Sequence, residues 1–76
     1  MIRAYTTIIT GAGTSENVVD EIRGLPNVAE AHVVAGDFDI IAEIEAEDVH
    51  GVQDTVAMGI RSLDGVGTTR TYIQLD

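Results

Sequence analysis

The segment Val33-Val34-Ala35-Gly36-Asp37-Phe38-Asp39-Ile40-Ile41-Ala42 joins two strand-like apolar runs through a short polar turn. Glycine suits such turns because it adopts positive φ angles without steric cost, and neighbouring backbone N–H groups are then free to point outward. Two carboxylates, Asp37 and Asp39, lie beside those donors. The turn therefore offers a counterpart to each charged group of a free amino acid, although Gly-Asp turns also close many hairpins that bind no ligand.

Upstream of this turn, the sequence predicts a strand, a helix and a second strand. Residues 2–9 are rich in β-branched and aromatic side chains, which favour a strand. Thr14 or Ser15 is a suitable N-cap for a helix over residues 15–24, and a strand is predicted over 28–35. The apolar residues of the helix recur at intervals of three or four: Val18, Val19, Ile22 and Leu25.

Downstream of the turn, a third strand is predicted over residues 39–46, where apolar and acidic residues alternate. Asp48 is expected to cap a second helix of four turns, and residues 66–75 are predicted to form the last strand. The second helix has the most regular apolar periodicity in the chain, carried by Val49, Val52, Val56, Ile60 and Leu63.

The predicted order of elements, β-α-β-β-α-β, is that of the α+β ferredoxin-like fold. Right-handed crossovers give a four-stranded antiparallel sheet of order 4-1-3-2 with two helices on one face. The other face carries Tyr5, Thr7, Ile9 and Ile41, among others, and is expected to pair with a second copy. Across neighbouring strands, we expect ion pairs of Arg3 and Arg70 with Glu43 or Glu45.

The composition predicts a small domain that associates with itself. A 76-residue chain buries only about 60% of its unfolded surface on folding, and this chain has no cysteine for disulfide bonds or thiolate metal sites. Its two histidines lie far apart in sequence, so we expect no metal site and no cofactor. Oligomerisation is the remaining common way to bury more of the 45% of residues that are apolar.

The charge is strongly acidic: 4 Lys+Arg, all arginine, against 13 Asp+Glu give a net charge of −9. Binding to nucleic acid or to anionic membranes requires a basic surface, which this composition does not provide. Dense acidic charge without lysine is typical of proteins from salt-loving archaea, in which salt screens self-repulsion. No signal peptide or membrane-spanning run is visible, so we expect a cytoplasmic protein.

Three segments resemble the effector domain of the Lrp/AsnC regulators, called the RAM domain. They are Leu-Pro-Asn-Val-Ala-Glu-Ala (25–31), Val-Ala-Gly-Asp-Phe-Asp-Ile-Ile-Ala (34–42) and Leu-Asp-Gly-Val-Gly-Thr-Thr-Arg-Thr-Tyr-Ile (63–73). Full-length members also carry an N-terminal helix-turn-helix domain, and nothing precedes the first predicted strand here. The resemblance implies that residues 1–76 are a single RAM domain without a DNA-binding helix-turn-helix.

The resemblance also implies what this domain binds and how it assembles. Members of the family dimerise through their sheets, as an α/β-barrel-like pair, and the dimers assemble into tetramers or octamers. A free amino acid binds between dimers as the effector. For this chain we therefore expect a non-enzymatic amino-acid sensor that modulates transcription or amino-acid metabolism, with hetero-association with full-length Lrp/AsnC regulators as a further expectation.

By the same resemblance, the candidate ligand-binding residues are Gly36, Asp37, Phe38, Asp39, Thr69 and Thr71. The amides around Gly36 would hold the α-carboxylate, and Asp39 would accept hydrogen bonds from the α-ammonium. Phe38 would form an apolar wall, and one of the two threonines would add a hydroxyl contact. Asp37 is also interpretable as a solvated turn residue, and Asp39 as a residue that closes the hairpin.

Two other functions are compatible with the same fold. An ACT-like regulatory domain would bind its amino acid at the loop after the first strand, which contains Gly11 and Gly13. A small enzyme of the dimeric α/β-barrel type would need an interior acid or base, and Tyr5 or Tyr72 with His32 is the only candidate set. No convincing catalytic arrangement of residues is present, which favours the binding domain.

Overall fold

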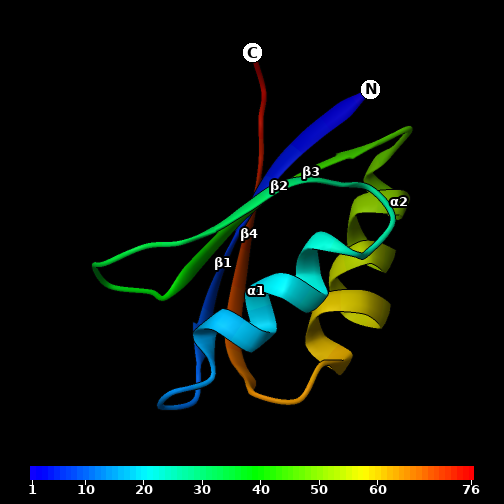
Figure 1. Ribbon diagram of the computed structural model, residues 1–76. Coiled ribbons are helices and arrows are strands. Elements are labelled where there is room, and N and C mark those ends of the chain that lie inside the picture. Colours follow the sequence, from blue (N-terminus) through cyan, green and yellow to red (C-terminus); the bar gives the residue numbers. More distant parts are fainter.

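The computed structural model describes residues 1–76, and two helical segments cover one face of its four-stranded antiparallel sheet (Figure 1). The sheet order is β2-β3-β1-β4, which confirms the predicted order 4-1-3-2 and the ferredoxin-like fold. The elements are β1 (Ile2–Thr10), α1 (Ser15–Arg23), β2 (Val28–Val33), β3 (Ile40–Ala46), α2 (Val49–Asp54), the π-helical turn η1 (Thr55–Gly59), the 3₁₀ turn η2 (Ile60–Ser62) and β4 (Val66–Ile73).

The core lies between the sheet and the two helical segments. Alternate residues of each central strand face the helices, because successive side chains of a strand point to opposite faces of the sheet. On β1 the buried residues are Ala4, Thr6 and Ile8, and Thr6 satisfies its hydroxyl with the Thr71 hydroxyl at 3.0 Å. The largest side chains that are almost entirely buried are Ile8, Ile22, Ile40, Ile44, Ile60, Val52 and Thr6.

The second helical segment is not the regular α-helix that its periodicity predicts. Its α-helical turns end at Asp54, and the chain continues through η1 and η2. Val52, Val56 and Ile60 are all buried and lie four residues apart. An α-helix has 3.6 residues per turn, so side chains four residues apart would turn progressively away from the sheet. The wider π-helical turn keeps the three side chains on the face that contacts the sheet. Thr55 lies at the transition, where its hydroxyl donates to the Gly51 carbonyl at 2.9 Å.

Asp48 caps α2 as predicted, since its Oδ1 accepts a hydrogen bond from the Gly51 N–H at 2.8 Å. Replacing Asp48 with alanine is expected to lower the free energy of unfolding by about 1 kcal/mol, because an N–H at the start of the helix loses its acceptor. Asp48→Asn retains an acceptor and is expected to lose only a few tenths. Urea denaturation of the two variants checks this, and equal losses would contradict the capping role.

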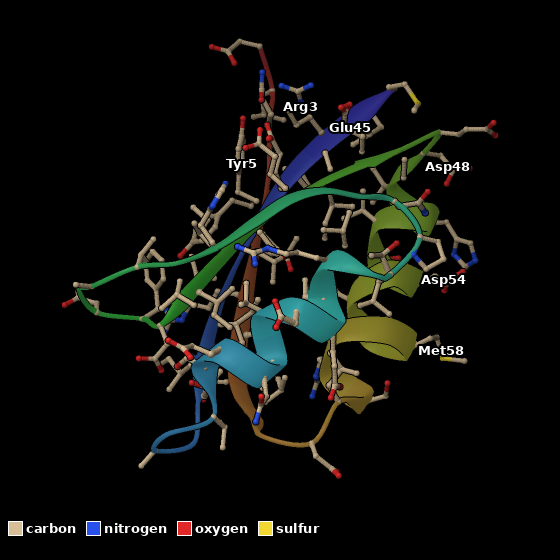
Figure 2. All side chains as sticks on the ribbon, viewed as in Figure 1. Arg3, Tyr5, Glu45, Asp48, Asp54 and Met58 are labelled. Atoms are coloured by element: carbon tan, nitrogen blue, oxygen red, sulfur yellow. The ribbon has the colours of Figure 1, made fainter.

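Arg3 forms the predicted ion pairs across the sheet, to Glu43 Oε1 at 3.2 Å and to Glu45 Oε1 at 3.0 Å. The negative charges of Glu45, which has the larger effect, and of Glu43 raise the pKa of Arg3 above its ordinary value. Figure 2 shows Arg3 and Glu45 at the end of the sheet that carries both chain termini. Arg70 has no ion pair, so the prediction is confirmed for Arg3 and wrong for Arg70.

Neither helical segment of the fold has the length and the apolar character that a membrane-spanning helix requires.

Candidate functional site

Several segments far apart in sequence meet at the other end of the sheet, as the predicted topology requires. The N–H of Gly11 donates to the carbonyl of Gly65 at 2.9 Å, which joins the end of β1 to the segment before β4. The N–H of Asp39 donates to the carbonyl of Ile8 at 3.0 Å, which joins the β2–β3 turn to β1. The ends of β1 and of the β2–β3 turn therefore form one surface with the start of β4.

The β2–β3 turn holds free backbone donors, as its sequence predicts. The two strands end at Val33 and Ile40, and one further hydrogen bond, from the Val34 N–H to the Asp39 carbonyl at 2.8 Å, closes the turn. None of the N–H groups of residues 35–38 donates to a backbone carbonyl. Gly36 has φ +150°, a conformation that side-chain-bearing residues rarely adopt, and a Cβ there would meet no atom within 4 Å.

Asp39 holds the turn against β1. Its Oδ2 accepts hydrogen bonds from the Thr10 N–H at 2.8 Å and from the Thr10 hydroxyl at 3.3 Å, and the side chain is half-buried. The Thr10 hydroxyl also lies 2.7 Å from that of Ser15, the first residue of α1. Asp39 therefore makes the structural contact that the hairpin-closing interpretation requires, while its second oxygen has no partner within the chain.

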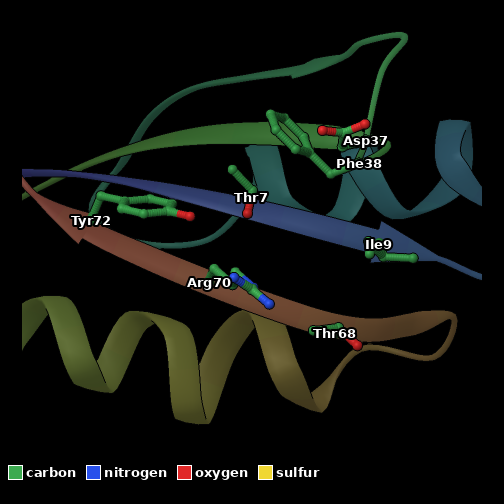
Figure 3. A pocket seen from close by; sticks show the side chains of 7 residues that line it. All are labelled: Thr7, Ile9, Asp37, Phe38, Thr68, Arg70 and Tyr72. Carbon is green, nitrogen blue, oxygen red and sulfur yellow. The ribbon is translucent and has the colours of Figure 1, made fainter.

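A hollow of about 370 Å³ opens on the uncovered face of the sheet beside this turn (Figure 3). Asp37 and Phe38 form one wall, Arg70 and Thr68 on β4 form the opposite wall, and β1 runs between them. The acidic and the basic group of the hollow thus come from opposite sides and form no ion pair with each other. The lining residues are Thr7, Ile9, Asp37, Phe38, Thr68, Arg70 and Tyr72.

The structure brings together some of the predicted ligand-binding residues and separates others. Asp37 and Phe38 line the hollow, and Gly36 and Asp39 flank them in the same turn. Thr69 and Thr71 do not line the hollow: they are paired with Ile8 and Thr6, the buried residues of β1, and therefore lie on the helix-covered face. Thr71 instead contacts Thr6 through its hydroxyl.

The residues of β4 that line the hollow are Thr68, Arg70 and Tyr72, none of which was among the predicted ligand-binding residues. The register of β4 decides which of its residues face the hollow, because shifting a strand by one residue moves every side chain to the other face. Arg70 is paired with Thr7 in the regular part of the β1–β4 ladder, so both side chains lie on the uncovered face of the sheet. No signal in the sequence pointed to Arg70 as a lining residue, since an ion pair with Glu43 or Glu45 was expected for it.

The candidate residues for an enzyme are not assembled into a site. Tyr5 and Tyr72 are paired across β1 and β4, and the Tyr5 hydroxyl donates to Gln74 Oε1 at 2.9 Å. His32 lies on β2, separated from β1 by β3, and its Nε2 is 3.1 Å from Glu30 Oε1. No group of three or more His, Asp or Glu side chains is placed to hold a metal ion.

The neighbours of Glu30 on β2 and β3 shift its pKa. The hydrogen bond with His32, followed by the contribution of Glu43, lowers the pKa of Glu30 below its ordinary value of 4.5. The stabilising contribution of ionised Glu30 is therefore present above the unfolded-state pKa and is lost as the pH falls through the native value.

NMR titration of the wild-type chain is expected to show the lowered pKa of Glu30. His32→Ala is expected to raise that pKa, because it removes the hydrogen bond between the two side chains. His50→Ala, which removes a contact with Asp54 elsewhere, is expected to leave it unchanged, and an equal effect of both variants would contradict this.

Sequence comparison assigns the chain to a protein family. Residues 3–76 match the model of the Lrp/AsnC ligand binding domain, and the chain therefore belongs to that family, as the resemblance of its three segments indicated. A similar curated relative is an uncharacterized HTH-type transcriptional regulator of Pyrococcus furiosus, 35% identical over 60 residues. That match covers 79% of this chain and 40% of the relative, so the chain spans less than half of the relative's length.

Solved structures share the fold of this chain. The protein TTHA0845 of Thermus thermophilus is 34% identical, with a TM-score of 0.95, and the match covers 100% of this chain and 95% of that one. A complex of the transcriptional regulator NMB0573 of Neisseria meningitidis with L-Met shares the fold, with a TM-score of 0.87 at 17% identity. That match covers 99% of this chain and 50% of the Neisseria protein.

Proposed function

We propose that this chain is a non-enzymatic, amino-acid-binding effector domain of Lrp/AsnC-type regulation. The observation that carries the proposal is the β2–β3 turn, where the unpaired N–H groups of residues 35–38 lie beside the carboxylates of Asp37 and Asp39. The hollow next to the turn offers space for a side chain. Family membership supports a ligand-binding role, and the Neisseria structure shows a protein of this fold in complex with an amino acid.

The chemistry of the turn fits the two charged groups of an amino acid. Backbone N–H groups that make no other hydrogen bond can donate to an α-carboxylate, as they do in other anion-binding turns. The α-ammonium is bonded to the same carbon, so it would reach an acceptor in the same turn, either Asp37 or the free Oδ1 of Asp39. Phe38 would contact the apolar part of the ligand.

Self-association would complete the site. The uncovered face of the sheet exposes Ile9 by 44% and Tyr72 by 54%, and a second copy packed there would cover both. We propose a dimer formed through this face, in the manner of an α/β-barrel-like pair, which assembles further into a tetramer or octamer. Full-length Lrp/AsnC regulators are the proposed hetero-association partners. The charge of −9 makes association dependent on salt, because like charges repel at low ionic strength.

Calorimetric titration of the chain with each standard amino acid tests the proposed function. Gly36→Ala is expected to weaken binding, because a side chain at this φ strains the turn and moves its amides. Gly13→Ala is a matched control: Gly13 also has a positive φ, +76°, and no atom within 4 Å of an added Cβ, but it lies in the loop after β1.

The two variants distinguish the possible sites. Loss of binding in Gly36→Ala with normal binding in Gly13→Ala supports the turn between β2 and β3. The reverse result would indicate an ACT-like site at the loop after β1. Absence of binding by any amino acid, in a chain that is folded and oligomeric, would contradict the proposed function.

A further inference from the structure

The charged side chains on the uncovered face of the sheet are divided between its two halves. The edge strand β2 carries Glu30 on this face. Its neighbour β3 carries Glu43 and Glu45, which are both paired with Arg3 on β1. The other edge strand, β4, carries Arg70, which has no ion pair within the chain. The face is therefore acidic at its β2 edge and basic at its β4 edge.

Arg70 and Glu30 cannot meet within one chain. The strand pairings form one row across the sheet from β4 to β2, made of Arg70, Thr7, Ile41 and His32. Neighbouring strands are about 4.8 Å apart, so the two ends of this row are separated by about 14 Å. The carboxylate of Glu30 reaches the β2 end of the row, because its Oε1 lies 3.1 Å from His32 Nε2. The two charges are thus at the same level along the strands and at opposite edges of the sheet.

A dimer formed through this face has two aligned arrangements with two-fold symmetry. The symmetry axis lies between the two sheets, and it runs either across the strands or along them. With the axis across the strands, each strand lies over its own copy, so the acidic half of one face meets the acidic half of the other. With the axis along the strands, β4 lies over β2 of the second copy, so basic and acidic edges meet. The charges of this face therefore favour the axis along the strands.

From this complementarity we infer that β4 of each copy lies over β2 of the other, and that Arg70 forms an ion pair with the partner's Glu30. The inference rests on the proposed dimer and specifies how its two copies are arranged. Rotation about an axis along the strands keeps every residue at its level, so Arg70 lies level with the carboxylate of the partner's Glu30. Packed sheets are about 10 Å apart, a gap that an arginine and a glutamate pointing toward each other can bridge. Two-fold symmetry gives two such ion pairs, one at each edge.

Charge reversal tests this arrangement by sedimentation velocity, at a salt concentration at which the wild-type chain is dimeric. Arg70→Glu and Glu30→Arg are each expected to weaken dimerisation at least about tenfold, because each variant places like charges opposite each other at both edges. An equimolar mixture of the two variants is expected to restore the dimer. In that heterodimer one pair keeps its native charges and the other pair has both charges reversed.

Arg61→Glu is the matched control, because it makes the same change of charge at an exposed, unpaired arginine on the helical side of the chain. It is expected to change dimerisation by no more than about twofold, since salt screens distant charges. Glu30→Arg separates the ion pair from overall repulsion, because it makes the net charge of −9 less negative and would strengthen a dimer opposed only by that repulsion.

Circular dichroism of each variant establishes that it is folded. If a reversed variant does not fold, Arg70→Gln and Glu30→Gln take its place. The two single variants and the double variant are then expected to weaken dimerisation by nearly the same factor, because each of them removes the same ion pair. Losses that add in the double variant would overturn the inference.

The remaining outcomes separate this inference from the proposed function. Stronger dimerisation of Glu30→Arg would show that the acidic halves face each other, and would overturn the inference. Weakening of both reversed variants without recovery in their mixture, or a dimer that neither reversal affects, would also overturn it and leave the proposed function standing. If the wild-type chain is monomeric even in concentrated potassium chloride, the proposed dimer fails and this inference fails with it. Binding of amino acids is measured separately, by the calorimetric titration.

Discussion

Replacing Ile8 with alanine is expected to lower the free energy of unfolding by about 2–5 kcal/mol, because the variant loses buried apolar surface and leaves a cavity. Ile8 is 0% exposed, at the centre of β1 beneath the helical segments. A domain of this size has a stability of only about 4–11 kcal/mol, so the loss is a large part of the total. Thermal denaturation followed by circular dichroism is expected to show a Tm lower by about 8 °C or more.

Ile9→Ala is the control for this prediction, because the two isoleucines are neighbours on β1 and point to opposite faces. Ile9 is 44% exposed on the uncovered face of a single chain, so its truncation is expected to cost about 1 kcal/mol or less in the monomer. Both variants should be compared at one low protein concentration and at low salt, where the chain is monomeric, since a second copy packed on this face would bury Ile9 and the stability of an oligomer depends on concentration. Equal losses from Ile8→Ala and Ile9→Ala would contradict the assignment of the core to one face.

Replacing Asp39 with alanine is expected to lower the free energy of unfolding by about 1–2 kcal/mol. The variant removes the acceptor of the Thr10 N–H and of the Thr10 hydroxyl, and hydrogen bonds to charged groups are among the stronger ones in proteins. Asp37→Ala serves as the control, since Asp37 is exposed and makes no hydrogen bond within the chain. It is expected to change stability by no more than about 0.5 kcal/mol.

Urea denaturation of these two variants measures how much the Asp39 carboxylate contributes to the free energy of unfolding. A loss confined to Asp39→Ala shows that this carboxylate closes the hairpin in the free protein. If Asp39→Ala is as stable as the wild type, the contact with Thr10 does not contribute in solution. Calorimetric titration of the same variants with an amino acid then measures the contribution of each carboxylate to binding.

The fold followed from the sequence because independent local signals agreed with one another. The alternation along residues 39–46 indicated which face of β3 is buried, and Asp48 marked the start of α2. The glycine turn connected β2 to β3. The widened turn at η1 was not predicted, because a run of apolar residues at intervals of three and four is read as an α-helix. Only the packing of Val52, Val56 and Ile60 against the sheet distinguishes the two.

The candidate site was predictable only in part, and the reason is the pairing of strands. The turn residues are adjacent in sequence, so Asp37 and Phe38 were found together from a local pattern. The opposite wall comes from β4, about 30 residues later in the chain, and which of its residues line the hollow depends on the register of β4 against β1. No local pattern in the sequence reports that register, so Thr69 and Thr71 were selected where Thr68 and Arg70 line the hollow.

The contacts of Asp39 would also couple the end of β1 to a ligand bound at the turn. The negative charge that holds the Thr10 N–H is the same charge that an incoming ammonium would attract, and the Thr10 hydroxyl in turn contacts Ser15, the first residue of α1. A cation bound at Oδ1 would draw negative charge away from Oδ2 and so weaken its hydrogen bonds with Thr10, and by thermodynamic reciprocity those hydrogen bonds would weaken cation binding by the same factor. If the turn binds an amino acid as proposed, ligand binding and the anchoring of the first helix would be coupled through this one carboxylate.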